Sequence, residues 1–80
     1  TLRLSHPALS RRIKQLEELV ELSREASHAS ERGFYLFSLG LALKAQGDDD
    51  GARTVLQEAQ SLGPDVLGAD LFRSVVSALS

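Results

Sequence analysis

The chain has 80 residues, 42% of them hydrophobic, which suits one small domain with a modest core. Nine Lys and Arg against eleven Asp and Glu give a formal charge of -2, so no bulk attraction to nucleic acid or anionic membranes is expected. The absence of cysteine excludes disulfides, thiolate chemistry and Cys-based zinc sites. No apolar run approaches the roughly 18 residues needed to cross a bilayer.

The first residues, TLRL, include neither an initiator Met nor the apolar region of a signal peptide. We therefore expect the chain to be an excerpt of a longer protein. The sequence does not identify its compartment, and the cytoplasm is the preferred expectation.

Apolar residues recur at helical spacing from about Pro7 to Ala26 and predict a first helix within residues 5–28. Ser5 or His6 suits its cap, and Pro7 suits its first turn. The predicted apolar face consists of Leu9, Ile13, Leu16, Leu19, Val20 and Ala26. The predicted solvated face consists of Glu17, Glu18, Glu21, Arg24 and Glu25.

The start of the chain is locally basic, with Arg3, Arg11, Arg12 and Lys14 preceding the first acidic residue, Glu17. SHPALSRRIKQLEE, residues 5–18, resembles the recognition helix of LysR-type transcription factors, which carries a Ser-x-Pro-Ala-Leu-Ser-Arg-x-Ile-x-x-Leu-Glu pattern. That resemblance implies a helix for the DNA major groove. The two helices that support such a reading head do not precede it here, and LVELSREAS replaces the family's Leu-Gly and wing. DNA binding by residues 5–18 is therefore the alternative to a capped amphipathic helix.

A polar break, SHASE (residues 27–31), separates the first helix from a second that runs to about Gln46, with Ser30 as its expected cap. Its segment FYLFSLGLALKA is apolar almost all round, which predicts burial on two sides. Gly47 suits a left-handed helix end, and the run Asp48 to Asp50 favours the start of the next helix.

The acidic run also invites comparison with a calcium loop, which needs a bidentate Glu at its twelfth position. With Gly51 as the loop glycine, the twelfth residue is Gln57, and Glu58 lies one residue too late. We therefore predict a solvated turn and cap without a metal.

A third helix ends at Gly63 and Pro64 and is striped by Ala52, Val55, Leu56, Ala59 and Leu62. A fourth helix is predicted over residues 65–79. Its apolar face consists of Val66, Leu67, Leu71, Phe72, Val75, Val76 and Leu79. The fold class predicted for this single domain, residues 1–80, is all-α, built from antiparallel helical hairpins.

The second and third helices share a spacing of small and large residues, in the order Leu36, Leu39, Gly40, Leu43, Gly47, Asp48, Ala52, Leu56, Ala59 and Pro64. This pattern over residues 33–66 resembles a tetratricopeptide repeat (TPR), whose period is about 34 residues. The resemblance implies one TPR-like repeat, flanked by the first helix and by a capping helix at 65–79, where Arg73 and Ser74 break the pattern.

Close packing of this hairpin explains a glycine inside a helix, and we expect Gly40 to lie opposite Ala52 or Ala59. The residues expected to be among the most buried are Leu39, Leu43, Val55, Leu56 and Ala59.

Catalytic chemistry lacks candidates in this sequence. His6 and His28 are the two imidazoles, and neither has a carboxylate at ligand spacing. No serine forms a nucleophile elbow and no Gly-rich loop cradles phosphate. We expect a protein that is not an enzyme and that binds no cofactor or metal.

In TPR proteins the first helix of each repeat lines the ligand groove. The resemblance places six residues there: Phe34, Phe37, Ser38, Leu41, Lys44 and Ala45. An apolar groove suits an amphipathic helix or hydrophobic peptide, from another protein or a second copy of the chain, with Lys44 at the rim. The predicted function is a protein-interaction scaffold, and nucleic-acid or membrane partners are not expected. The alternative is that Phe37 and Leu41 pack beneath the first helix as ordinary core.

Overall fold

The computed structural model describes residues 5–24 and 28–80 and is all-helical there, with no strand. This confirms the all-α prediction. The described residues form five helices rather than the four predicted. Their bounds are α1 Ser5–Leu22, α2 Ala29–Gln46, α3 Asp49–Ser61, α4 Gly63–Leu67 and α5 Ala69–Leu79.

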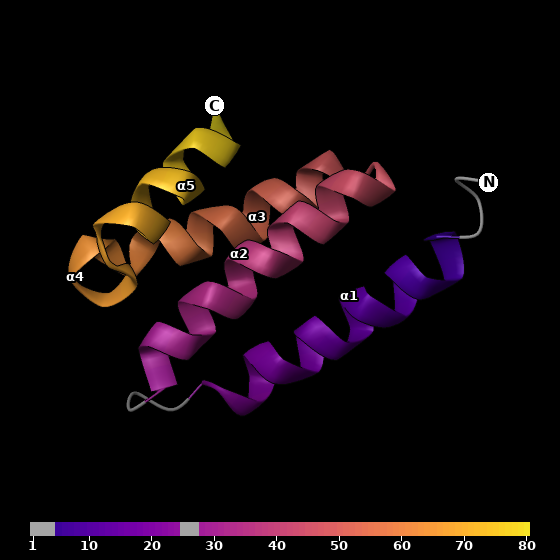
Figure 1. Ribbon diagram of the computed structural model, residues 1–80, viewed down its shortest axis with the longest axis horizontal. Helices are drawn as coiled ribbons and strands as arrows, with labels where there is room; N and C mark the ends of the chain where they lie inside the picture. Colours follow the sequence, from indigo (N-terminus) through magenta and orange to yellow (C-terminus); the bar gives the residue numbers. More distant parts are fainter. Residues whose placement is uncertain (1–4, 25–27) are drawn as a thin grey trace.

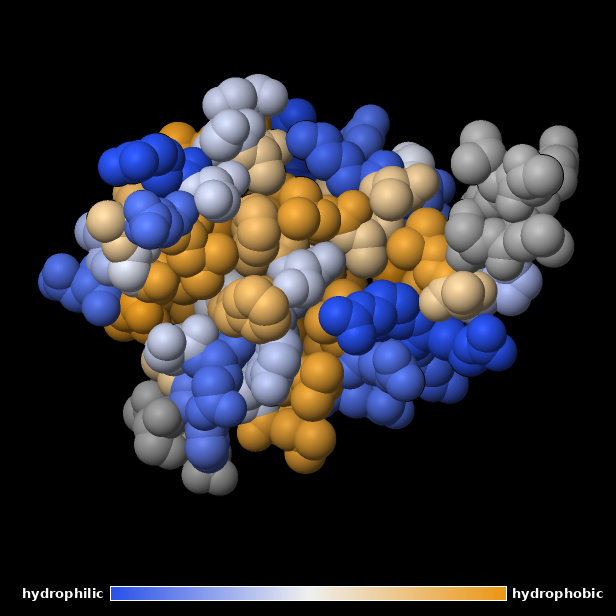
Figure 2. Space-filling model, in the orientation of Figure 1, coloured by the Kyte–Doolittle hydropathy of each residue, from blue (hydrophilic) through white to orange (hydrophobic). Residues whose placement is uncertain are grey.

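Helix α2 is the centre of the molecule (Figure 1). It forms one antiparallel hairpin with α1 and another with α3, whereas α4 packs near the start of α2 and α5 runs back along α3 until its last turn reaches Lys44. From the same side, apolar residues form a band over α2 and the α4–α5 pair, and hydrophilic residues gather over the N-terminal part of α1 (Figure 2). None of the helices in the described ranges is long and apolar enough to cross a membrane.

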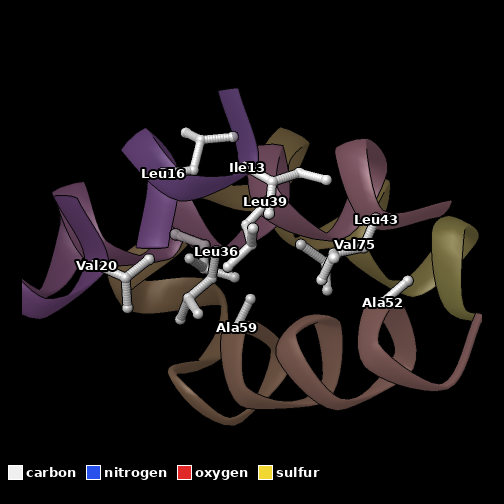
Figure 3. Packing of buried hydrophobic residues seen from close by; sticks show 10 residues of the cluster. Ile13, Leu16, Val20, Leu36, Leu39, Leu43, Ala52, Ala59 and Val75 are labelled. Atoms are coloured by element: carbon white, nitrogen blue, oxygen red, sulfur yellow. The ribbon is translucent and has the colours of Figure 1, made fainter. Parts of the chain in front are cut away.

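The core lies between α2 and the helices around it (Figure 3). Its largest fully buried side chains are Leu16, Leu36, Leu56 and Val75. Four of the five residues expected to be most buried are buried, namely Leu39, Leu43, Leu56 and Ala59. The fifth, Val55, is only half-buried, because it lines an open groove between α1 and α3.

Gly40 lies where α2 and α3 pack closely, as expected. A Cβ atom placed on it would be 2.5 Å from Cγ and 2.6 Å from Cδ2 of Leu56. The nearest side chain is therefore Leu56, and the expectation that Ala52 or Ala59 would oppose Gly40 was wrong. Because Gly40 has no side chain, Leu56 has room to fill the space where α2 and α3 cross.

The turn between α2 and α3 follows the predicted chemistry. Gly47 has φ 93° and ends α2 in the left-handed conformation. The side chain of Asp48 caps α3 by accepting a hydrogen bond from the backbone N–H of Gly51 at 2.9 Å. Asp49 and Asp50 occupy the first turn, near the positive end of the helix dipole.

Helix α1 ends at Leu22, earlier than the predicted limit of residue 28. The hydroxyl of Ser23 donates to the Val20 carbonyl at 2.9 Å, and Arg32 from α2 donates to the Ser23 carbonyl at 2.9 Å. These bonds satisfy carbonyl groups that a continuing helix would have used. Glu25 and Ala26 lie outside the described residues, as do Thr1 to Leu4.

Helix α2 begins after His28 rather than after Ser30, and no side-chain hydrogen bond caps it. The predicted cap at Ser30 was therefore wrong. Pro7 does lie in the first turn of α1, as expected.

The predicted helix over residues 65–79 is divided in two by Gly68. This residue has φ 86° and ψ 153°, a conformation that breaks a helix and is accessible almost only to glycine. The short α4 brings Leu67 onto Gly33 of α2, where a Cβ atom on the glycine would be 2.1 Å from Leu67 Cδ2. Gly63 and Pro64 thus end α3 and also start α4.

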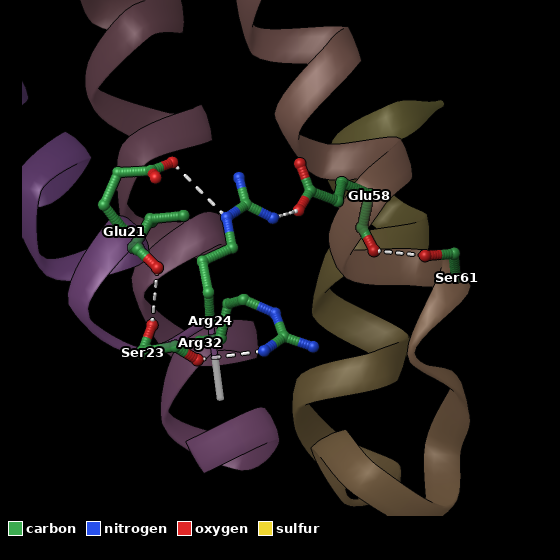
Figure 4. Close-up of polar contacts among 7 residues, drawn as sticks. Glu21, Ser23, Arg24, Arg32, Glu58 and Ser61 are labelled. Atoms are coloured by element: carbon green, nitrogen blue, oxygen red, sulfur yellow. Dashed lines mark hydrogen bonds and ion pairs between the residues drawn. The ribbon is translucent and has the colours of Figure 1, made fainter. Parts of the chain in front are cut away.

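A polar latch of Glu21, Arg24 and Glu58 joins the end of α1 to α3 (Figure 4). Arg24 Nε lies 3.3 Å from a Glu21 carboxylate oxygen, and Arg24 Nη1 donates to Glu58. The hydrogen bond to Glu58 raises the pKa of Arg24 above its usual value. Because the three side chains are largely open to solvent, the latch contributes little to stability.

Candidate functional site

The six predicted partner-binding residues occupy one side of α2, which we call the α2 face. Phe34 is 55% exposed and Leu41 is 44% exposed. Lys44 and Ala45 are also exposed, while Phe37 and Ser38 are half-buried. Phe34 and Leu41 lie two helical turns apart, with Phe37 and Ser38 one turn from each, so all six belong to one continuous stripe.

The opposite side of α2 carries its buried residues, which are Gly33, Leu36, Leu39, Gly40 and Leu43. These residues pack against the α1, α3 and α4 side chains of the core. One side of α2 is thus fully buried, whereas the α2 face is only partly covered. Leu41 does not lie beneath α1 as the alternative required, whereas Phe37 does pack partly against the core.

Lys44 has a different role from the one expected at a groove rim. Its Nζ donates a hydrogen bond to the Ala78 carbonyl at 2.9 Å, in the last turn of α5. A cation at this end of a helix interacts favourably with the helix dipole. Lys44 therefore anchors α5 to α2 and is already engaged at the edge of the face.

Two apolar residues beside the α2 face were not among the predicted site residues. The ring of Tyr35 packs edge-on against Phe34, with centroids 6.1 Å apart. Leu22, at the end of α1, is 76% exposed and lines a shallow depression with Tyr35. Leu22 lies on the side of α1 opposite its apolar stripe. Its position in the helical period was the one sequence signal that Leu22 would be exposed.

The described residues contain no candidate metal site. No group of three or more His, Cys, Asp or Glu that could hold a metal ion lies among them. His28 Nδ1 lies 2.9 Å from Glu31 Oε1, which corrects the expectation that this imidazole has no carboxylate partner. The His28–Glu31 pair is exposed and spans one helical turn, which is typical of a surface contact rather than a catalytic dyad. Asp48, the first residue of the acidic run compared with a calcium loop, acts as the N-terminal cap of α3.

The LysR-like segment, residues 5–18, forms most of α1. Arg11, Arg12 and Lys14 are exposed, whereas Ile13 and Leu16 are buried in the core beside α2. The segment is thus an amphipathic helix whose apolar side is occupied within the domain. Its basic side stays open.

No family model, curated protein or solved structure matches this chain. The TPR-like and LysR-like resemblances therefore remain predictions from their motifs. The arguments for the site rest on the exposure and packing of its own residues.

Proposed function

We propose that this chain is a protein-interaction module whose α2 face binds the apolar side of a helix, supplied by another protein or by a second copy. The observation that carries this proposal is the joint exposure of Phe34 and Leu41, two turns apart on a helix whose other side is core. The proposed function is binding alone and includes no catalytic step. The TPR resemblance supports the same face, since the first helix of such a repeat lines the ligand groove.

The expected energetics follow from apolar burial. Fully covering an exposed large apolar side chain stabilises a complex by about 1.5 to 3 kcal/mol, and apolar anchors at i, i+3 and i+7 suit a helix laid along α2. Phe34, Phe37 and Leu41 supply those anchors. Because this attraction is not coulombic, binding is expected to survive high salt.

The substitution Leu41→Arg tests this function. We expect it to abolish self-association, measured by sedimentation, and binding of a neutral Leu/Gln amphipathic peptide, measured by fluorescence anisotropy. Helical content and melting temperature should stay close to the wild-type values, because the arginine can reach solvent.

Two control variants sharpen the test. Gln57→Arg adds the same charge to an exposed site on α3 and should leave both kinds of association unchanged. Leu39→Arg buries an unpaired charge and should unfold the domain. Loss of fold in Leu41→Arg would assign Leu41 to the core, and retained association by the folded variant would remove the α2 face from the function.

DNA binding through residues 5–18 is the alternative function, favoured by the joint exposure of Arg11, Arg12 and Lys14. We expect only weak attraction to duplex DNA, because three cations on one helix release few counterions and nearby carboxylates oppose them. A salt titration of duplex binding measures this. Tight binding at about 0.15 M salt that is lost in Arg11→Ala/Arg12→Ala would establish the alternative.

A further inference from the structure

A hollow lies on the side of α2 opposite the α2 face, between α1 and α3, and we call it the α1–α3 groove. Its apolar lining comes from three helices and consists of Val20, Leu36, Leu39 and Val55. The groove exists because α1 and α3 each pack against α2 without their backbones approaching one another. Val55 is the residue that this gap leaves half-buried.

The walls of the α1–α3 groove are mainly acidic. Glu17 and Glu21 line it from α1, and Glu58 lines it from α3. Arg24 is the one cation in the lining and is already held by Glu21 and Glu58. Three carboxylates and one guanidinium give the lining a formal charge of -2. Glu17 makes no hydrogen bond or ion pair within the described part of the chain.

The size of the groove indicates what it can hold. Its volume is about 280 Å³, below the roughly 300–1,000 Å³ typical of small-molecule pockets. It is open along its length, so it suits one or two side chains of a segment lying over it. An apolar floor between carboxylate walls fits the aliphatic stem of a lysine or arginine together with its charged head.

We propose that the α1–α3 groove is a second docking surface that binds a cationic amphipathic helix from a partner protein. An apolar side chain of the partner contacts Val55, the half-buried residue of the apolar lining, and a lysine or arginine of the partner pairs with Glu17. Charge complementarity selects this partner and sets the rate of encounter. The surface is independent of the α2 face, because the two lie on opposite sides of α2 and the groove depends on coulombic attraction.

The test uses a short synthetic helix of Leu and Lys, about four turns long, and its counterpart with Glu in place of Lys. Binding to the whole chain is measured by fluorescence anisotropy at about 0.05 M and about 0.5 M NaCl. We expect the Lys peptide to bind, to lose at least about tenfold in affinity at the higher salt, and to shift the methyl resonances of Val20, Leu39 and Val55. The Glu peptide should leave these three methyl resonances unshifted, because the carboxylates of the groove repel it, whatever it does at the α2 face. Leu41→Arg should leave the methyl shifts unchanged, which separates this surface from the α2 face.

A matched pair of neutral substitutions identifies the groove. Glu17→Gln should weaken binding by roughly two- to fivefold, the value of one partly screened ion pair. Glu18→Gln, one residue along on α1 and outside the groove lining, should have a smaller effect. Equal weakening by both variants, equal shifts of the groove methyl resonances by the Glu peptide, or methyl shifts confined to Leu41 and its neighbours would each overturn the proposal.

Discussion

At the scale of single residues, the side of α2 on which an apolar residue lies decides whether it packs in the core or is exposed to solvent. Leu39 and Leu41 are two positions apart and equally hydrophobic, yet one is buried and the other is 44% exposed. Residues two positions apart on a helix point about 200° away from each other, so Leu39 and Leu41 face opposite sides of α2. From the sequence alone, Leu41 could be assigned either to the core or to the surface, because α2 is apolar on both sides.

Gly40 provides the residue-scale prediction. Gly40→Leu should lower the free energy of unfolding by about 1 to 3 kcal/mol, despite a helix-propensity gain of about 1 kcal/mol, because the added side chain collides with Leu56. In thermal unfolding this corresponds to a fall of at least about 4 °C. Ala45→Leu adds bulk to an exposed site on the same helix and should leave the melting temperature nearly unchanged. An unchanged or raised value for Gly40→Leu would show that the crossing is not tight.

At the scale of elements, three glycines with positive φ determine where helices stop. Gly47 separates α2 from α3, Gly63 separates α3 from α4, and Gly68 separates α4 from α5. The first was predicted from its position before three aspartates. The break at Gly68 was missed, since a single glycine within an apolar periodic segment is compatible with a continuous helix.

Substitution by asparagine should distinguish two of these breaks. Gly47 has φ 93° and ψ 5°, close to the left-handed region that asparagine tolerates, so Gly47→Asn should change stability little. Gly68 has φ 86° and ψ 153°, so Gly68→Asn should cost about 1 to 3 kcal/mol. A Cβ atom at either site would meet no atom within 4 Å, which leaves backbone strain as the cause. Chemical denaturation measures both variants, and equal costs would contradict the interpretation.

At the scale of the whole molecule, α1 is the least supported of the long helices. Its backbone approaches α2 alone within the described ranges, and the latch through Arg24 and Glu58 is an exposed side-chain link to α3. Helix α2, by contrast, contacts every other helix. Docking of α1 therefore depends on the apolar contacts of Ile13, Leu16 and Val20.

We expect α1 to open before the α2–α3 hairpin in native-state hydrogen exchange. Leu16→Ala should weaken its docking by about 2 to 5 kcal/mol and accelerate exchange in α1 more than in α3. Leu22→Ala removes the same side chain from an exposed position on the same helix and should have little effect. Uniform acceleration in both helices for Leu16→Ala would indicate a single cooperative unit instead.

Local periodicity and turn chemistry in the sequence determined the all-α class, the apolar stripe of α1 and the cap and turn around Gly47 and Asp48. These features depend on residues within a few turns of one another, so a single sequence contains the required information. Helical spacing also places the six residues of the α2 face on one side of the helix, while their role in binding stays a prediction from the resemblance.

Only the tertiary structure decided which side of α2 is core, because that depends on where α1, α3, α4 and α5 come to lie. The same applies to Leu56 filling the space at Gly40, to Lys44 binding the end of α5, and to the α1–α3 groove beside Val55. Each of these involves residues far apart in sequence or a gap between helices. Periodicity specifies the direction of a side chain from its own helix, whereas the neighbour it meets is set by how the helices pack together.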